Sequence, residues 1–210
     1  MPKHDFNDFF SKNIPTETEI IANWISYDST EPYVSVICTS FNHQEYIENT
    51  IKSFLLQETT LPFEIIIHDD ASTDNTVSII QKYAKKYPRI IKTTLQKNNQ
   101  FSINGHLPFL NCIKASSGKF VALCEGDDFW IASNKLETQI QASILNPEVF
   151  LFVHPAIQVE EGRKNLLINN HHNEKTIIPL KKLIAEGAGF VPTASLFIKK
   201  KSLINLIPIM

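Results

Sequence analysis

Apolar runs and polar breaks alternate regularly through the middle of the 210-residue chain. Four of the runs are rich in β-branched residues, as is typical of strands that are buried on both faces of a sheet. They occupy residues 33–42, 63–68, 89–96 and 119–124. Apolar residues recur at helical spacing in the stretches between them, which are residues 44–56, 75–86 and 107–116. Strands that alternate with helices predict an α/β fold with a mostly parallel, Rossmann-like central sheet and helices on both faces.

The pattern continues less clearly toward both ends of the chain. Residues 134–145 predict a further helix whose inward positions are Leu136, Ile140, Ile144 and Leu145. Residues 148–160 read as strand material, and the rest mixes short strands with short helices. We therefore divide the chain into an N-terminal extension (1–32) packed onto the main domain, a core (33–146) and a C-terminal portion (147–210).

Composition and charge exclude some partners. With 20 basic and 22 acidic residues the formal net charge is −2, so nothing draws the whole chain to nucleic acid or to anionic lipid. Cys38, Cys112 and Cys124 lie in apolar surroundings without metal or redox spacing, which indicates buried, reduced thiols. No stretch approaches the roughly 20 apolar residues that cross a bilayer, and no leader is evident. We expect a cytoplasmic protein that binds no nucleic acid.

Polar clusters follow three of the predicted strands. They read "TSFN", "DDAS" and "EGDDFW". In open parallel sheets, ligands bind beyond the carboxyl ends of the strands. Because all three clusters belong to that edge, we expect them to form one site.

The acidic cluster contains Glu125, Asp127 and Asp128, followed at once by Phe129 and Trp130. Neighbouring carboxylates repel one another and lose hydration where aromatic side chains cover them, so something must offset this cost. Mg²⁺ and Mn²⁺ prefer oxygen ligands and often combine one or two carboxylates with substrate phosphates. The cluster therefore favours a divalent cation that holds a diphosphate.

The other two clusters leave alternatives open. Asp69 and Asp70 either brace the turn and cap the next helix or bond a ribose and a base N–H. Phe41 either stacks on a base or packs beneath its loop. Asn42 either bonds a ligand or caps the next helix.

Four segments, taken in order, resemble the family 2 glycosyltransferases, nucleotide-sugar enzymes with the GT-A fold. They read "VSVICTSFNHQEYIENTIKSFLLQ", "FEIIIHDDASTDNT", "ASSGKFVALCEGDDFW" and "NKLETQI". The resemblance is close over residues 32–146 and looser in "GAGFVPTASLFIKK". It makes residues 33–146 a nucleotide-sugar-binding core and 147–210 an acceptor-side portion.

The resemblance also implies residue roles. Glu125 stands where many relatives carry the first Asp of the acidic motif. Asp69 and Asp70 would bind base and ribose, and UDP is the expected nucleotide. The implied donor-binding residues are Thr39, Phe41, Asn42, Asp69, Asp70, Glu125 and Asp127, and the implied ligands of Mn²⁺ or Mg²⁺ are Asp127 and Asp128.

The activity implied is inverting transfer of a sugar from the nucleotide-diphosphate donor to a hydroxyl acceptor. A carboxylate base would take the acceptor proton while the diphosphate leaves, stabilised by the metal. Relatives carry this base downstream of the acidic motif, yet no Asp follows Asp128 here. Glu186 is one candidate, and otherwise we expect the base to lie beyond Met210, which predicts a truncated core with weak or absent transfer. The resemblance further implies a glycan or lipid-linked acceptor, bacterial surface polysaccharide synthesis, and peripheral contact with the inner membrane face.

Three other classes of protein share parts of this pattern. A signalling receiver domain would carry its paired acids after the first strand, whereas here they follow the second and fourth. A sugar nucleotidyltransferase would need a glycine-rich, basic phosphate loop after the first strand, and "TSFNHQEY" lacks one. A catalytically incomplete nucleotide-sugar-binding domain stays open because no downstream base is evident.

Overall fold

The computed structural model describes residues 6–25, 31–159, 166–168, 176, 178–179, 181, 185 and 191–206. In chain order its elements are α1 (Asn7–Phe10), α2 (Glu17–Ala22), β1 (Val34–Ser40), α3 (Ile47–Leu55), β2 (Phe63–Asp69), α4 (Thr76–Lys86), β3 (Ile91–Leu95), α5 (Leu107–Ala115), β4 (Phe120–Leu123), α6 (Lys135–Leu145), β5 (Leu151–Phe152), β6 (Ala156–Gln158), β7 (Leu166–Ile168), the 3₁₀ turn η1 (Thr193–Ser195), β8 (Phe197–Lys199) and α8 (Lys200–Leu206).

A six-stranded sheet forms the centre of the molecule, in the order β3-β2-β1-β4-β8-β5. The first four strands of this order are parallel, whereas β8 runs antiparallel to both β4 and β5. The two remaining short strands, β6 and β7, pair with each other in a separate antiparallel ribbon. The predicted mostly parallel sheet is confirmed.

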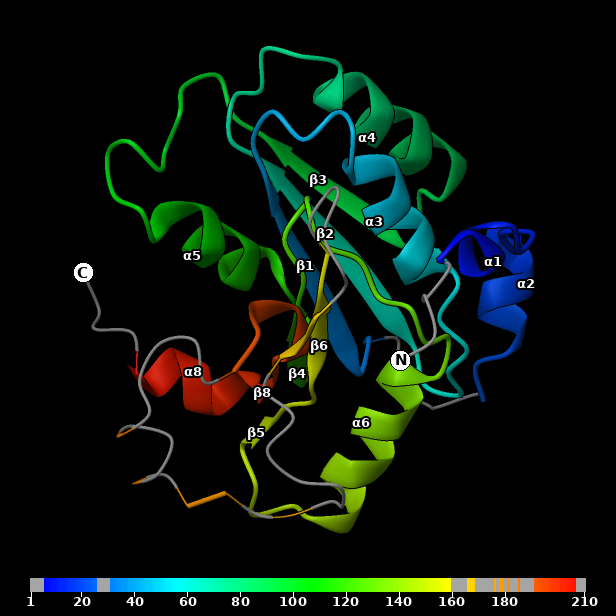
Figure 1. Ribbon diagram of the computed structural model, residues 1–210, viewed down its shortest axis with the longest axis vertical. Helices are drawn as coiled ribbons and strands as arrows, with labels where there is room; N and C mark the ends of the chain where they lie inside the picture. The colour runs from blue at the N-terminus through cyan, green and yellow to red at the C-terminus, as the bar shows by residue number, and fades with distance from the viewer. Residues whose placement is uncertain are drawn as a thin grey trace.

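Helices cover both faces of the sheet (Figure 1). Successive strand residues point to opposite faces, so Val36 and Cys38 join one buried cluster and Ile37 joins another. The larger cluster lies under α2, α3, α4 and α6, and the smaller one lies under α5 and α8. All three cysteines are buried and free, as predicted.

The N-terminal extension packs onto the larger cluster. Thr16 and Glu19 form a capping box that starts α2, which buries Ile20. The Tyr87 hydroxyl donates to the Pro15 carbonyl at 2.9 Å, and Trp24 packs edge-on against Phe63. These contacts join the extension to β2 and to the end of α4.

One prediction for α6 is wrong in part. Leu136 and Ile140 are buried as expected, but Ile144 is 51% exposed and Leu145 is 77% exposed. The buried apolar positions of α6 lie in its first turns, whereas in its last turn, which ends at Leu145, the buried position is the polar Ser143. Helical periodicity predicts which face of a helix points inward, but not how much of the helix length lies over the core.

Candidate functional site

The three polar clusters meet at the carboxyl edge of the parallel strands. The Asp70 N–H donates to the Ser40 carbonyl at 2.9 Å, which joins the turn after β2 to the end of β1. The Gly126 N–H donates to the Thr39 carbonyl, also at 2.9 Å, which joins the turn after β4 to the same strand. The end of β1 therefore lies between the two acidic segments.

Residues 125–128 form the acidic turn, whose backbone is held by the first turn of α3. The Thr50 hydroxyl lies 2.7 Å from the Asp128 carbonyl oxygen and 3.0 Å from that of Gly126. Within the turn, the Asp128 N–H donates to the Glu125 carbonyl at 3.0 Å. Thr50 is fully buried, so the position of the acidic turn depends on a hydrogen bond from the interior.

The carboxylates of the acidic turn are in electrostatic conflict. Loss of hydration raises the pKa of Glu125, and the charges of Asp127 and Asp128 raise it further. Burial and the charge of Asp127 likewise raise the pKa of Asp128, against a smaller opposing effect from His43. The Asp127 side chain is 53% exposed, and its Oδ2 lies 3.9 Å from His43 Nε2. The turn therefore holds more negative charge than its protein neighbours neutralise.

The donor set fits a hard divalent cation that is shared with a ligand. In the part of the chain that the structure describes, no group of three or more Asp, Glu, His or Cys side chains surrounds a metal position. Asp127 and Asp128 offer carboxylate oxygens, one of them well exposed. A cation held by one or two carboxylates typically completes its shell with water and substrate phosphate oxygens. The charge conflict in the turn also favours a cation there.

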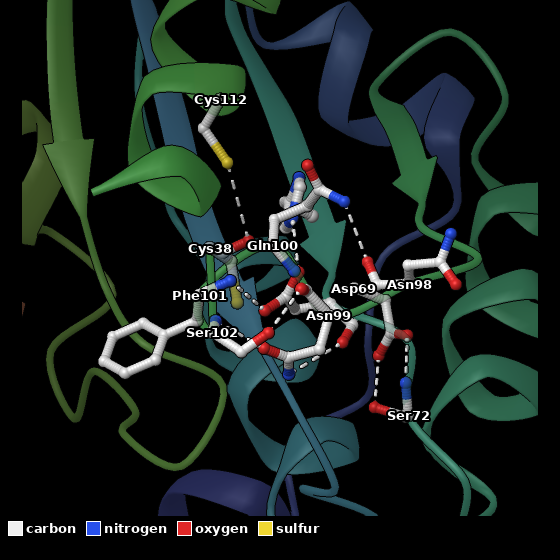
Figure 2. A network of polar contacts seen from close by, with 11 residues as sticks. Cys38, Asp69, Ser72, Asn98, Asn99, Gln100, Phe101, Ser102 and Cys112 are labelled. Atoms are coloured by element: carbon white, nitrogen blue, oxygen red, sulfur yellow. Dashed lines mark hydrogen bonds and ion pairs between the residues drawn. The ribbon is translucent and has the colours of Figure 1, made fainter. Parts of the chain in front are cut away.

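The Asp69 and Asp70 side chains are both buried, and both accept hydrogen bonds from neighbouring segments. Figure 2 shows Asp69 beside Ser72. Asp69 accepts the Ser72 N–H at 2.9 Å and the Ser72 hydroxyl at 2.5 Å. Asp70 accepts the Gln100 N–H at 2.7 Å and the Phe101 N–H at 2.9 Å. Asp69 therefore braces the turn, as considered, whereas Asp70 braces a different loop and α4 starts without a side-chain cap. Each carboxylate oxygen can accept more than one hydrogen bond, and a nucleotide role for the pair stays a prediction.

Residues 98–102 cover the end of β2, with the Phe101 ring turned away from the network (Figure 2). Asn99 Nδ2 donates to the Asp70 carbonyl at 3.3 Å, and the Ser102 N–H donates to Asn99 Oδ1 at 2.8 Å. The Phe101 side chain is 65% exposed. The loop thus combines a tight polar base with an exposed aromatic ring beside the predicted nucleotide pocket.

In the first cluster, Asn42 does not take the capping role, and its ligand role stays a prediction. Asn42 has a left-handed backbone, with φ of 56°, and its Oδ1 accepts the Thr73 N–H at 2.8 Å. It therefore links the turns after β1 and β2 and does not cap α3, whose first residue lacks a side-chain cap. Phe41 is 43% exposed, which leaves its ring free to contact a ligand. Thr39 is half-buried at the end of β1.

Two site residues were missed in the sequence. His43 packs beside the acidic turn, and Ser40 faces the same glycine, Gly126. A histidine directly after the first polar cluster was the available signal. Glu186, the candidate base, lies outside the described residues. No helix in the described part of the chain is both long enough and apolar enough to cross a membrane.

Comparison with known proteins identifies relatives. The family model described as glycosyl transferase family 2 matches residues 35–206. An uncharacterized protein of Mycobacterium tuberculosis is 38% identical over 133 residues, which is 63% of this chain and 38% of the relative. The Escherichia coli protein WfgD, named as a UDP-Glc:alpha-D-GlcNAc-diphosphoundecaprenol beta-1,3-glucosyltransferase, is 29% identical over 148 residues, which is 70% of this chain and 52% of WfgD.

The solved structures support the fold. The structure of residues 1–349 of S. aureus TarS in complex with UDP matches 82% of this chain and 48% of that one, with a TM-score of 0.60 and 21% sequence identity. At this identity the likeness concerns the fold alone. This chain spans about half the length of WfgD and less of the mycobacterial relative, at 52% and 38%.

Proposed function

The chain belongs to glycosyl transferase family 2, and we propose that it forms the donor-binding part of an enzyme that moves a sugar from UDP-sugar to a hydroxyl acceptor. The observation that carries the proposal is the acidic turn itself. It holds three carboxylates at the carboxyl edge of a parallel sheet, and their excess negative charge is suited to a cation shared with a diphosphate.

Asp127 and Asp128 would hold Mn²⁺ or Mg²⁺, and Glu125 would line the donor site beside them. When bound, the cation would neutralise charge that develops on the leaving diphosphate. The protein's own part is to hold these carboxylates close together, which the buried Thr50 contact to the backbone of the turn supports. The fixed position of the turn reduces the reorganisation that donor binding would otherwise require.

The base and ribose would lie at the neighbouring strand ends. Asp69 and Asp70 would bind them, and Phe41 would stack on the base from the end of β1, with Thr39 and Asn42 at the pocket edge. The 43% exposure of Phe41 supports the stacking role. Because Gln100 and Phe101 already donate to Asp70, the base would use its remaining acceptor capacity or displace the loop.

The acceptor side is inferred from the relatives. WfgD is named for transfer to GlcNAc-diphosphoundecaprenol, and by analogy we propose a glycan or lipid-linked acceptor and a role in bacterial surface polysaccharide synthesis. The enzyme would then work in the cytoplasm at the inner membrane face. Transfer would proceed with inversion, with Glu186 as one candidate for the carboxylate base.

Calorimetric titration of UDP into the 210-residue chain tests the donor site, first with Mn²⁺ and then with excess chelator. We expect binding that the chelator weakens strongly. Absence of binding in both conditions would contradict the proposal. Metal-dependent binding of UDP-sugar without turnover in this chain would instead favour the alternative, a catalytically incomplete nucleotide-sugar-binding domain.

A further inference from the structure

His43 lies where the end of β1, the start of α3 and the acidic turn meet. Its carbonyl oxygen accepts the N–H groups of Tyr46 at 3.0 Å and Ile47 at 2.9 Å, so its backbone is fixed to the first turn of α3. Its side chain is only 23% exposed. The ring therefore has a defined place beneath the turn and is not a freely moving surface group.

The ring faces the exposed Asp127 carboxylate of the turn. Nε2 lies 3.9 Å from Asp127 Oδ2, and among the described residues this is the ion pair that a basic side chain makes with the acidic turn. No lysine or arginine of the described ranges forms an ion pair with a carboxylate of the acidic turn. The imidazole is thus the protein group able to set the direction of the Asp127 carboxylate.

Gly126 provides the space that the ring occupies. A Cβ atom at this position would lie 2.7 Å from His43 Nδ1 and 3.0 Å from Ser40 Oγ. Real Cβ atoms do not approach neighbours as closely as the first distance, so only glycine admits the ring here. Gly126, which directly precedes the two proposed metal ligands, therefore leaves the space that the His43 ring fills.

Two buried polar atoms at this position lack a partner in the described part of the chain. They are His43 Nδ1 and Ser40 Oγ, both facing Gly126. Buried polar groups are normally hydrogen-bonded, and leaving one unpaired costs roughly 1–3 kcal/mol. A histidine kept at such a cost, with its other nitrogen toward a carboxylate, points to a role in the site.

We infer that His43 is a positioning residue that orients the Asp127 carboxylate for the divalent cation and the donor diphosphate. The inference rests on the proposed function and deepens it. Side chains that contact a metal ligand fix its orientation, and their loss typically lowers metal affinity by about 10–100-fold. An ordinary exposed ion pair would contribute little, so the two roles predict different outcomes.

The test compares His43→Ala, His43→Gln and the wild-type chain, with His106→Ala as the matched control because His106 is exposed at the start of α5. Two titrations are followed. UDP is titrated by calorimetry with Mn²⁺ and with chelator, and Mn²⁺ is titrated alone by electron paramagnetic resonance. Thermal unfolding of each variant in chelator shows whether the fold is retained.

We expect His43→Ala to weaken Mn²⁺ binding by about 10-fold and to weaken UDP binding only where the metal is present. His43→Gln, whose amide nitrogen reaches toward the position of Nε2, should recover most of this loss, and His106→Ala should match the wild type. Unchanged Mn²⁺ affinity in His43→Ala would overturn the inference, as would equal losses with and without metal.

The failure of the proposed function is distinguishable from the failure of this inference. Wild-type chain that binds UDP without any metal dependence would overturn the role of His43 and leave a nucleotide site standing. Wild-type chain that binds Mn²⁺ alone but no UDP would contradict the donor proposal, and the His43 variants would still decide the positioning role. Wild-type chain that binds neither would overturn both.

Discussion

The side-chain hydroxyl of Thr50 lies 2.7 Å from the carbonyl oxygen of Asp128. This contact joins the first helix after β1 to the turn after β4, and the two segments are 78 positions apart in the chain. The same hydroxyl lies 3.0 Å from the Gly126 carbonyl. The geometry of the candidate metal site is therefore set partly by a helix that carries none of its carboxylates.

Thr50→Val should reveal this dependence. Valine keeps the shape of threonine but removes the single O–H that the turn carbonyls share, the shortest contact being to Asp128, at a cost of about 1–3 kcal/mol in the free energy of unfolding. Metal-dependent UDP binding should weaken as the turn loosens. Urea denaturation and calorimetry give both quantities. Thr50→Ser keeps the hydroxyl and serves as the control, and equal stability of the two variants would contradict the role given to this contact.

Replacing Asp127 and Asp128 together with Asn should abolish metal-dependent UDP binding and leave the fold intact. The carboxylate oxygens that would hold the cation are lost, whereas the backbone contacts of the turn remain. Calorimetry with Mn²⁺ measures the binding, and circular dichroism checks the fold. The hypothesis of a metal at this position fails if the double variant binds UDP with unchanged affinity and the same response to chelator.

Asp128→Asn alone should change the pH dependence of stability in the absence of metal. Because the pKa of Asp128 is raised in the folded chain, the folded state binds more protons than the unfolded state just above pH 3.8, so wild-type stability falls as the pH rises through that window. The variant lacks this contribution. Thermal unfolding in chelator at about pH 3.8 and at pH 7, which brackets the window on its lower and upper side, should show the variant gaining stability relative to the wild type at the higher pH. A difference that does not change with pH would contradict the raised pKa.

Asp70→Ala should loosen the loop that carries Phe101. The N–H groups of Gln100 and Phe101 lose their acceptor, and because both hydrogen bonds are only partly buried, the cost for each falls below the roughly 1–3 kcal/mol of a fully buried unpaired group. Hydrogen exchange at these two amides should speed up, and UDP affinity should fall even in chelator. Faster exchange with unchanged UDP affinity would assign Asp70 to the loop alone.

Much of the fold could be predicted from the sequence because the parallel strands are buried on both faces. Apolar runs such as the one that became β2, Phe63–Asp69, mark such strands clearly. Element ends were less exact. Helix α3 starts at Ile47 rather than at residue 44, since the intervening residues form a turn anchored on His43.

For the candidate site, the sequence predicted which residue types lie at the strand ends, but not which of them contact one another. The acceptor roles of Asp70 depend on amides that lie about 30 positions further along the chain, and the place of His43 depends on the distant Asp127. Such pairings arise from the tertiary fold, and no local pattern encodes them. Burial has the same dependence on the tertiary fold: Ile144 has the helical spacing of an inward residue but is exposed.

Lys135 provides a prediction about a buried charge beside the site. Its side chain is almost fully buried, and its Nζ lies 3.6 Å from the centre of the Trp130 ring. Within the described ranges this nitrogen has no hydrogen-bond partner. Burial lowers the pKa of Lys135 to about 7, against a smaller opposing effect of Cys124. The folded chain therefore favours the neutral amine above neutral pH.

The sign of the effect follows from proton binding. Between pH 7 and pH 10.5 the unfolded chain keeps the Lys135 proton that the folded chain has released, so the free energy of unfolding rises with pH. The buried thiols act in the opposite direction, because burial raises the pKa of Cys112 to about 12 while the unfolded thiol titrates near 9.0. A comparison at pH 7 and about pH 8.5 lies below most of the thiol titration.

Lys135→Met isolates the lysine, because the thiol contributions are shared with the wild type and cancel in the difference. Urea denaturation of both chains should show wild-type stability rising relative to the variant by about 1–2 kcal/mol between the two pH values, given about 1.4 kcal/mol per pH unit for one proton. A constant difference would mean that the ammonium stays protonated over the Trp130 ring. The buried lysine would then carry its charge beside the site under all neutral conditions.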